Sequence, residues 1–261
     1  MNRRRFLQGL VGTAAGAAWG LPAMPAAAQS PAAGQANRRI QFVFAQVRYR
    51  GGDWDPRPRA TTPMMEELMR RTSVEAEKER RVVALTDREL FSYPFLYMAG
   101  KYDFQPFSES EVENLRRFLS FGGFLLADNT LGQLGYGFDR RFRAEMKRVF
   151  PEQEMQKVPL THALLRSYYL IRSIGGRVAT SSYLEGIHLG ETTPVVYCHN
   201  DLAGAWERDG LGRWSHPCVP NGEAQRRDAF HLGVNLILYS MTGNYKQDLI
   251  HVPFIRRRLT Q

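Results

Sequence analysis

The chain has 261 residues and a formal net charge of +9 at neutral pH. Its first 28 residues have the pattern of a removable leader, and the 233 residues that remain suffice for one good-sized core, or for a core with a small annex. The leader holds three arginines and no acid, so its removal lowers the net charge to about +6. A charge of this size, spread over isolated arginines, argues against nucleic acid as the partner of an exported protein.

Residues 1–28 contain the three zones of a twin-arginine export signal. The segment from Arg3 to Leu7 is the charged start, residues 9–21 are weakly apolar and broken by glycine, and small residues around Ala28 allow cleavage. A membrane anchor would need about 20 consecutive apolar residues, and neither this segment nor a later one meets that need. We therefore expect a signal peptide (1–28), a spacer (29–37) and a single exported α/β domain (38–261), located in the periplasm or otherwise outside the cytoplasm.

Short apolar runs typical of buried strands alternate with helical patterns along the rest of the chain. The predicted strands are residues 40–47, 82–85, 95–98, 124–127 and 194–197. The predicted helices are residues 63–71, capped by Thr61 or Thr62, residues 109–121, residues 138–149 and residues 226–242. Strands that alternate with helices imply crossover connections, and so a mostly parallel sheet covered on both faces. The sequence thus predicts a three-layer, doubly wound α/β fold.

The second of these helices has the clearest signals. Ser108 and Glu111 have the spacing of a capping box, and Phe107 with Val112 supplies the matching hydrophobic staple. Two glycines at 122 and 123 predict the end of the helix immediately before the next strand.

Ligands of doubly wound sheets bind beyond the carboxyl ends of the strands. Four predicted strand ends deliver carboxylates, amides, an imidazole and aromatic rings to this edge: Asp53, Trp54, Asp55, Lys101, Tyr102, Asp128, Asn129, His199, Asn200 and Asp201. Each exit alone is also explained as a turn, because Asp, Asn and Gly favour turns. Four exits at one edge predict a polar pocket.

The last predicted helix is apolar nearly all round, yet Asp228, His231 and Asn235 form one polar stripe along it. Buried polar groups need partners. The stripe therefore contacts either ordinary core backbone or loops beside the pocket, and in the second case His231 and Asn235 are candidate ligand-binding residues.

Cys198 and Cys218 are the only cysteines. In an oxidising compartment they form a disulfide across the loop between them or remain two free thiols. Together with His199 and His216 they resemble a zinc set, but neighbouring side chains at a strand end point to opposite faces, and the spacing is not that of zinc ligands. The chain also lacks a dinucleotide-binding loop. We therefore expect neither a metal nor a cofactor.

Several segments resemble a bacterial family, the domain of unknown function 4159 family, over about residues 38–258. They are residues 93–98, 122–129, 200–202, 206–207, 230–235 and 251–254. The order strand, Ala-Gly, capped helix, Gly-Gly, strand also resembles the class I glutamine-amidotransferase-like superfamily, including its trehalose-utilisation-protein-like branch. This resemblance implies a flavodoxin-like fold.

The amidotransferase chemistry is not implied, because the residues that perform it are absent. Enzymes of that superfamily place a Cys nucleophile on a sharp turn after a strand, whereas this chain has Asp128 after the corresponding strand. Where their late motif has an acid after His, this chain has Cys218 after His216 and Pro217. We therefore do not expect glutaminase activity.

Two functions of different classes remain open. The first is a non-catalytic binding or assembly module for a small polar ligand or a protein partner in the cell envelope. Three aromatic residues would then stack on a sugar or a peptide: Trp54, Tyr102 and Trp206.

The alternative is a hydrolase that acts on a carbohydrate or a cell-wall-type substrate. In that hypothesis Asp128 is a general base paired with His199 or His231, or it forms an acid/base pair with Asp53. The hypothesis requires an open position for Asp128, and it fails if this carboxylate is buried and bound by backbone amides.

Overall fold

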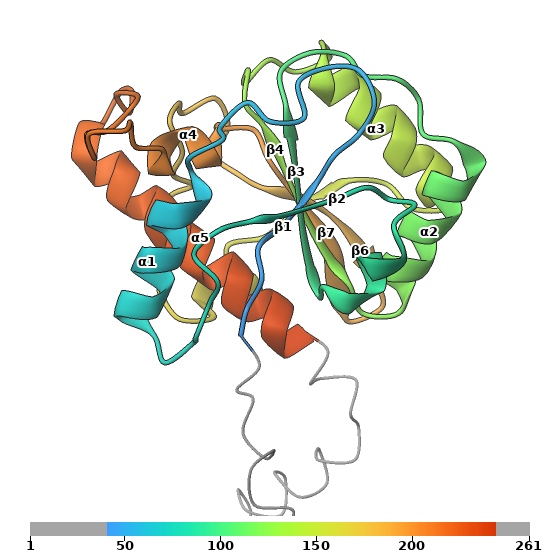
Figure 1. Ribbon diagram of the computed structural model, residues 1–261, viewed down its shortest axis with the longest axis horizontal. Coiled ribbons are helices and arrows are strands. Elements are labelled where there is room, and N and C mark those ends of the chain that lie inside the picture. The colour runs from blue at the N-terminus through green and yellow to red at the C-terminus, as the bar shows by residue number, and fades with distance from the viewer. Residues whose placement is uncertain (1–40, 244–261) are drawn as a thin grey trace, which may run out of the picture. The chain divides into compact units, whose positions relative to one another are not determined.

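A seven-stranded sheet lies between two layers of helices in the part of the chain that the computed structural model describes, residues 41–243 (Figure 1). These residues belong to one compact unit. The predicted leader and spacer, and the segment from residue 251 to residue 254, lie outside the described residues. No helix within residues 41–243 is long and apolar enough to cross a membrane.

The strand order is β2-β1-β3-β4-β7-β6-β5. The first five strands in this order are parallel to one another: β2 (Arg81–Val83), β1 (Ala45–Val47), β3 (Phe95–Gly100), β4 (Phe124–Asn129) and β7 (Thr192–Cys198). Two antiparallel pairings, of β6 (Glu185–Leu189) with β7 and of β5 (Gln156–Lys157) with β6, complete the sheet. The predicted α/β fold with a mostly parallel, three-layer, flavodoxin-like arrangement is confirmed.

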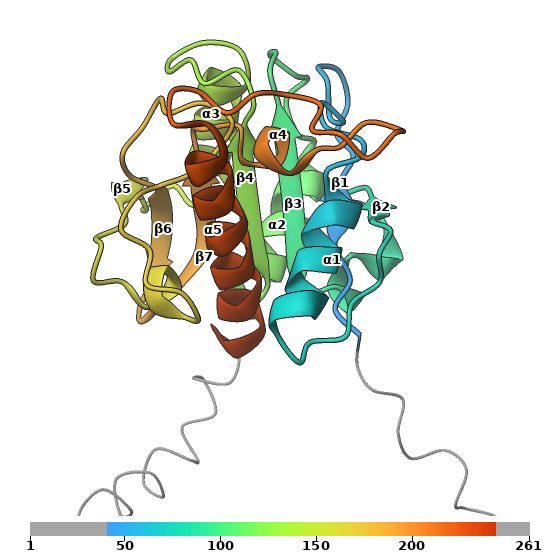
Figure 2. The ribbon, with the colours of Figure 1, turned by 90° about the vertical axis from the view of Figure 1, so that its left-hand side faces the viewer.

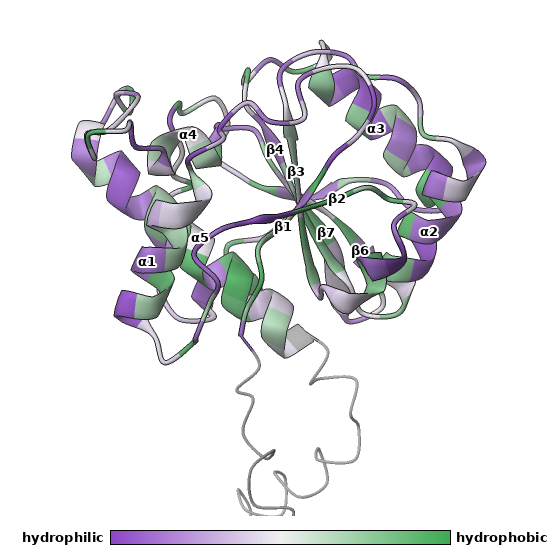
Figure 3. Cartoon of the chain, viewed as in Figure 1, coloured by the Kyte–Doolittle hydropathy of each residue, from purple (hydrophilic) through white to green (hydrophobic). Residues whose placement is uncertain are grey.

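The helices cover both faces of the sheet (Figures 1 and 2). One layer contains α1 (Thr61–Arg71), α4 (Leu202–Trp206) and α5 (Gly222–Gly243), and the other contains α2 (Glu109–Ser120) and α3 (Phe138–Val149). Two short 3-10 helices, Arg88–Ser92 and Ala163–Arg166, lie in the connections. Each face of the sheet has its own apolar cluster, and hydrophilic residues mark the outer faces of α1, α2 and α3 (Figure 3).

Local sequence signals account for the start of α2. The Ser108 side chain accepts a hydrogen bond from the Glu111 amide (3.3 Å), and the Glu111 carboxylate accepts one from the Ser108 amide (2.7 Å). The predicted capping box is therefore formed. The predicted cap of α1 is wrong: Ala60 occupies the N-cap position, and Thr61 is already helical and buried. This helix begins without a side-chain cap.

Besides the two 3-10 helices, three elements were not predicted, and each has a weak local pattern. β5 has only two residues, and β6 contains a glycine and alternates poorly. α4 has only five residues, and its N-cap is Asp201. β4 also continues through Asp128 and Asn129, which the sequence placed in a loop. These two polar residues therefore lie inside the sheet.

Candidate functional site at the carboxyl edge of the sheet

Asp128 is completely buried at the end of β4. Its carboxylate accepts hydrogen bonds from the backbone amides of Leu202 (2.9 Å) and Ala203 (3.0 Å) and from the hydroxyl of Tyr97 (2.9 Å). Burial, together with the nearby carboxylate of Asp201, raises the pKa of Asp128 to about 6. This carboxylate fastens the first turn of α4 to the sheet, and it presents no free oxygen to a substrate. The geometry argues against the predicted role as general base.

Asp201 is the centre of a buried ion-pair cluster beside Asp128. It has a positive φ of 51°, which Asp tolerates better than most residues, and its carboxylate is fully buried. Arg57, from the loop after β1, donates from Nε (2.9 Å) and from a second nitrogen, and Arg177 donates from Nε. The Gly204 amide adds a fourth donor at 3.2 Å. Asp201 thus joins three segments that are distant in sequence.

His216 and Glu207 extend this cluster towards solvent. The Nε2 atom of His216 lies 2.8 Å from an Nη atom of Arg57 and 3.1 Å from Glu207 Oε2. Burial and the charge of Arg57 lower the pKa of His216, which favours a neutral ring. A guanidinium can only donate, so Nε2 accepts from Arg57 and cannot also donate to Glu207. The lone pair that a general base would use is therefore occupied.

His199 lies on the opposite face of the sheet from Asp128. Its Nε2 atom is 2.6 Å from Glu185 Oε2, and its ring contacts Tyr197, within the cluster that α3 covers. Within residues 41–243 its buried Nδ1 atom has no hydrogen-bond partner, and it lies 4.0 Å from Asp139 Oδ1. The predicted dyad of Asp128 and His199 is not formed, because consecutive residues of a strand point to opposite faces and Asp128 pairs in register with the residue before His199.

The other carboxylates predicted for the pocket hold loops in place. Asp53 accepts hydrogen bonds from the backbone amides of Lys101 (2.7 Å) and Tyr102 (3.2 Å), and so it joins the loops after β1 and β3. Asp55 forms a two-point ion pair with Arg80. Tyr102 is 56% exposed, which leaves its ring free for contact. Neither Asp53 nor Asp55 is arranged as an acid/base partner of Asp128.

The predicted amides and the third aromatic residue also have structural partners. Asn129 bonds to the backbone of residues 131, 132 and 133, and Asn200 bonds to that of residues 174 and 181. Trp206 is 1% exposed and donates its indole N–H to a backbone carbonyl of α5. Trp206 therefore cannot stack on a ligand.

The polar stripe of α5 binds loops of the protein. Asn235 is buried, accepts hydrogen bonds from the amides of Tyr168 and Tyr169 and donates to the Tyr169 carbonyl. His231 stacks on the Tyr169 ring, with centroids 3.8 Å apart, and Asp228 accepts from a serine hydroxyl. Of the two alternatives for this stripe, the structure shows the structural one, because its residues bind the protein's own loops. His231 and Asn235 do not contact Asp128.

Both cysteines are free and buried, so of the two alternatives the structure has the free thiols and not the disulfide. Cys198 ends β7, and Cys218 lies in the loop before α5. Burial raises the pKa of both thiols, and a buried thiol with a raised pKa is a poor nucleophile. Among residues 41–243, no three His, Cys, Asp or Glu side chains are grouped so that they could hold a metal ion.

The open part of this edge is a groove of about 590 Å³ where β1 and β2 end, beside the start of α2. It lies next to the point where the strand order reverses between β1 and β3, which is where ligands of such sheets bind. We call it the switch-point groove. The polar and aromatic side chains considered below that line it are Arg48, Arg50, Trp54, Thr86, Ser108 and Glu111.

The charges of the switch-point groove are not balanced. Glu111 is used by the capping box and by Arg50, whose Nη2 atom lies 3.3 Å away. Arg48 is exposed and forms no ion pair within the described part of the chain. One wall is the backbone at Gly51 and Gly52, whose φ values of 70° and 62° favour glycine. The groove thus offers arginine donors beside an indole ring.

Of the predicted ligand-binding residues, only Trp54 lines this groove. The sequence reasoning missed Arg48, Arg50 and the ion-pair partners Arg57 and Arg177. A signal for the first two was present, because they directly follow a predicted strand. The other two lie in loops without a pattern.

Two comparisons bear on identity. The model of the family described as "Domain of unknown function (DUF4159)" matches residues 43–241. A search of the curated proteins found no match.

Proposed function

The chain belongs to the DUF4159 family, and we propose that it is an exported, non-catalytic binding module whose switch-point groove takes a small polar ligand with an anionic group. The observation that carries the proposal is the state of Asp128. Both oxygens of its buried carboxylate accept hydrogen bonds, from two backbone amides and a tyrosine hydroxyl, so the strongest candidate for a catalytic residue serves to hold α4.

The other candidate acids, bases and nucleophiles are not arranged for catalysis either. A hydrolase needs an acid and a base that face one cleft, whereas the Asp53 carboxylate is bound by amides and His199 lies on the other face of the sheet. Cys198 and Cys218 are buried thiols. The groove, in contrast, is open, and its Arg48 forms no ion pair within the described residues.

The chemistry of the groove supports an anionic ligand. Arg48 and Arg50 provide guanidinium forks that match the geometry of a carboxylate or a phosphate. Trp54 provides an aromatic ring, and Thr86 and Ser108 provide hydroxyl groups. A sugar that carries an acidic group combines a face for the indole with oxygens for the arginines. We take such a molecule as the ligand class.

A titration followed by ¹⁵N NMR tests this proposal with three probes: inorganic phosphate, glucose 6-phosphate and glucose. Glucose 6-phosphate should shift the indole N–H signal of Trp54 and the amide signals of Gly51 and Gly52, phosphate should shift them less, and glucose should leave them in place. Arg48→Gln should reduce the shifts, whereas Arg172→Gln, which removes an exposed arginine outside the groove, should not. The absence of any shift with both anions would overturn the proposal.

We further propose that the family belongs to the class I glutamine-amidotransferase-like superfamily. Support comes from the strand order and from the position of Asp128, which follows the capped helix α2 at the end of β4. An experimental structure in which the carboxyl end of β4 superimposes on the nucleophile turn of such an enzyme would support this proposal. A different order of connections between the strands would contradict it.

Export through the twin-arginine pathway is part of the proposal, and it rests on the leader sequence. Replacement of Arg3 and Arg4 by lysine should retain the protein in the cytoplasm, because the pathway requires the arginine pair. Fractionation of cells that express either form measures this, and equal export of the two forms would contradict it.

A further inference from the structure

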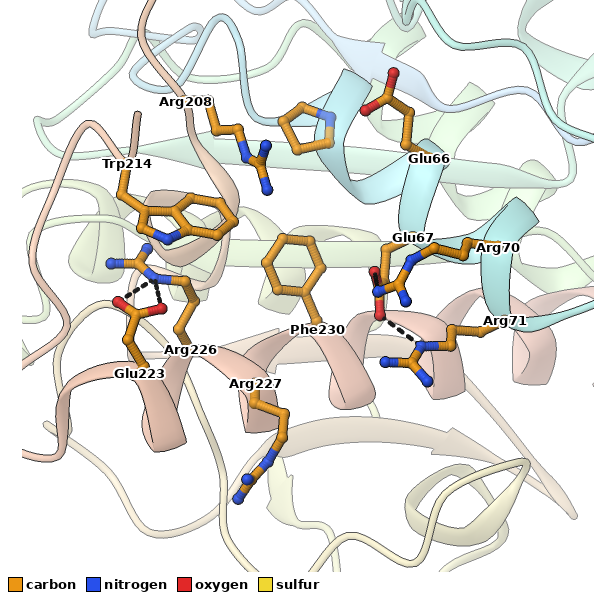
Figure 4. A pocket seen from close by; sticks show the side chains of 11 residues that line it. Glu66, Glu67, Arg70, Arg71, Arg208, Trp214, Glu223, Arg226, Arg227 and Phe230 are labelled. Atoms are coloured by element: carbon orange, nitrogen blue, oxygen red, sulfur yellow. Dashed lines mark hydrogen bonds and ion pairs between the residues drawn. The ribbon is translucent and has the colours of Figure 1, made fainter. Parts of the chain in front are cut away.

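A second groove, of about 470 Å³, lies between α1 and α5 on the other side of the helical layer from the sheet (Figure 4). We call it the α1–α5 groove. Its floor is Phe230, which is 8% exposed, and Trp214 from the loop of residues 207–221 packs beside it with ring centroids 5.9 Å apart. Apart from Pro63, the rest of the lining is charged, with five arginines and three glutamates. Charged walls around an apolar floor are typical of a surface that binds both charge and an apolar side chain.

The arginines of the α1–α5 groove exceed the acids that could neutralise them. Arg70 and Arg71 share a single carboxylate, Glu67. Arg208 forms no ion pair within residues 41–243, and the carboxylate nearest to Arg227 is its neighbour in sequence, at 3.7 Å. Both of these side chains are exposed. The groove therefore retains donors that an acidic ligand can use.

Arg208 is already held in a binding position. Its guanidinium carbon lies 4.2 Å from the centroid of the Trp214 ring, and the buried Arg226 supports the same ring at 4.4 Å. Figure 4 shows Arg208 above the indole and Arg226 below it. Arg226 is fixed in turn by hydrogen bonds to two backbone carbonyls and to Glu223. A stacked guanidinium loses little side-chain freedom on binding, which favours affinity.

The chain's own terminal segments do not have the charge to occupy this groove. Residues 244–261 contain three consecutive arginines and a lysine against one aspartate, and residues 29–40 contain two arginines and no acid. Both segments carry a net positive charge, as the groove does, and would be repelled by it. A flat anionic surface or a uniformly anionic polymer also fits poorly, because the exposed side chains of Glu66 and Glu223 also line the groove. A short segment with separate acidic and apolar side chains satisfies all of these groups.

We propose that the α1–α5 groove docks an acidic peptide segment of a partner protein, with a carboxylate on Arg208 and an apolar side chain over Phe230. This surface is separate from the switch-point groove, so the two sites can be tested independently. A carboxylate accepts two hydrogen bonds from the guanidinium fork of an arginine. Phe230 offers an apolar contact that a peptide side chain can make and a simple ion cannot.

The test uses a capped octapeptide of aspartate and glutamate with two leucines, and a matched peptide in which every acid is replaced by its amide. Isothermal titration measures affinity, and NMR follows the indole N–H of Trp214 and the Nε–H of Arg208. The acidic peptide should bind and shift both signals. Arg208→Gln should weaken binding about tenfold, as expected for the loss of a charge-assisted hydrogen bond, whereas Arg172→Gln should change it less than twofold.

Arg208 is exposed, so its variant is expected to fold, and circular dichroism checks this. Three results would overturn the proposal: equal weakening by Arg208→Gln and Arg172→Gln, equal binding of the amide peptide, or binding of anionic phospholipid vesicles with no binding of the acidic peptide. The first would indicate attraction by net charge, the second a purely apolar contact, and the third a membrane surface.

Discussion

Replacement of Asp128 by asparagine separates a structural carboxylate from a catalytic one. In the wild type the two carboxylate oxygens accept from the amides of Leu202 and Ala203. An asparagine has only one acceptor oxygen, so its NH₂ group faces one of these amides in either orientation. A buried N–H without an acceptor costs about 1–3 kcal/mol. Removal of the charge beside Asp201 offsets part of this cost, and we expect a net loss of about 1 kcal/mol at pH 8.

The loss should increase at lower pH. Burial and the nearby Asp201 raise the pKa of Asp128 to about 6, against about 3.9 in an unfolded chain. The folded wild type therefore binds this proton more tightly than the unfolded chain does. Stability from this group is present below the unfolded value and is lost as pH rises through the folded value. Between pH 8 and pH 5 the wild type gains on the order of 1 kcal/mol, and the variant gains none from this position.

Urea unfolding followed by circular dichroism at pH 8 and pH 5 measures both effects. The Asp128→Asn variant should unfold at lower urea than the wild type at pH 8, and the difference should widen at pH 5. A variant as stable as the wild type at both values would refute the reasoning, because an exposed catalytic carboxylate tolerates this substitution without a loss of stability.

Two further predictions concern the same edge of the sheet. Cys198 and Cys218 should resist iodoacetamide at pH 7 in the folded protein, because burial raises the pKa of both thiols, and both should react in urea; rapid labelling of the folded protein, seen by mass spectrometry, would contradict this. Gly204→Ala should destabilise the fold by about 1–3 kcal/mol, because a Cβ atom there would lie 2.4 Å from the Asp201 carboxylate. Gly210→Ala, with open space around it, is the matched control and should unfold within error of the wild type.

The fold was predictable from the sequence because its signals are local. The apolar runs at residues 95–98 and 124–127 and the capping box of α2 specify their elements without reference to the rest of the chain. β5 and β6 were missed because neighbouring strands, rather than their own short sequences, hold them in the sheet.

The sequence predicted that polar side chains gather at the carboxyl edge of the sheet, but not which of them lie together there. The sequence placed Asp128 and His199 after adjacent strands, but the face that each side chain takes depends on the register between β4 and β7. The partners of Asp201 could not be inferred either, because Arg57 is 144 positions away and lies in a loop without a pattern. The residues that look reactive in the sequence are thus the ones that fasten the loops, and the open groove is lined by arginines that no motif marks.

The most direct test of the central claim is an isothermal titration of the mature protein with glucose 6-phosphate. We expect that the wild type binds, that the Arg48→Gln/Arg50→Gln double variant binds at least about tenfold more weakly, and that Asp128→Asn, if folded, binds with wild-type affinity. Unchanged binding by the double variant, or a loss of binding confined to Asp128→Asn, would contradict a binding module at the switch-point groove.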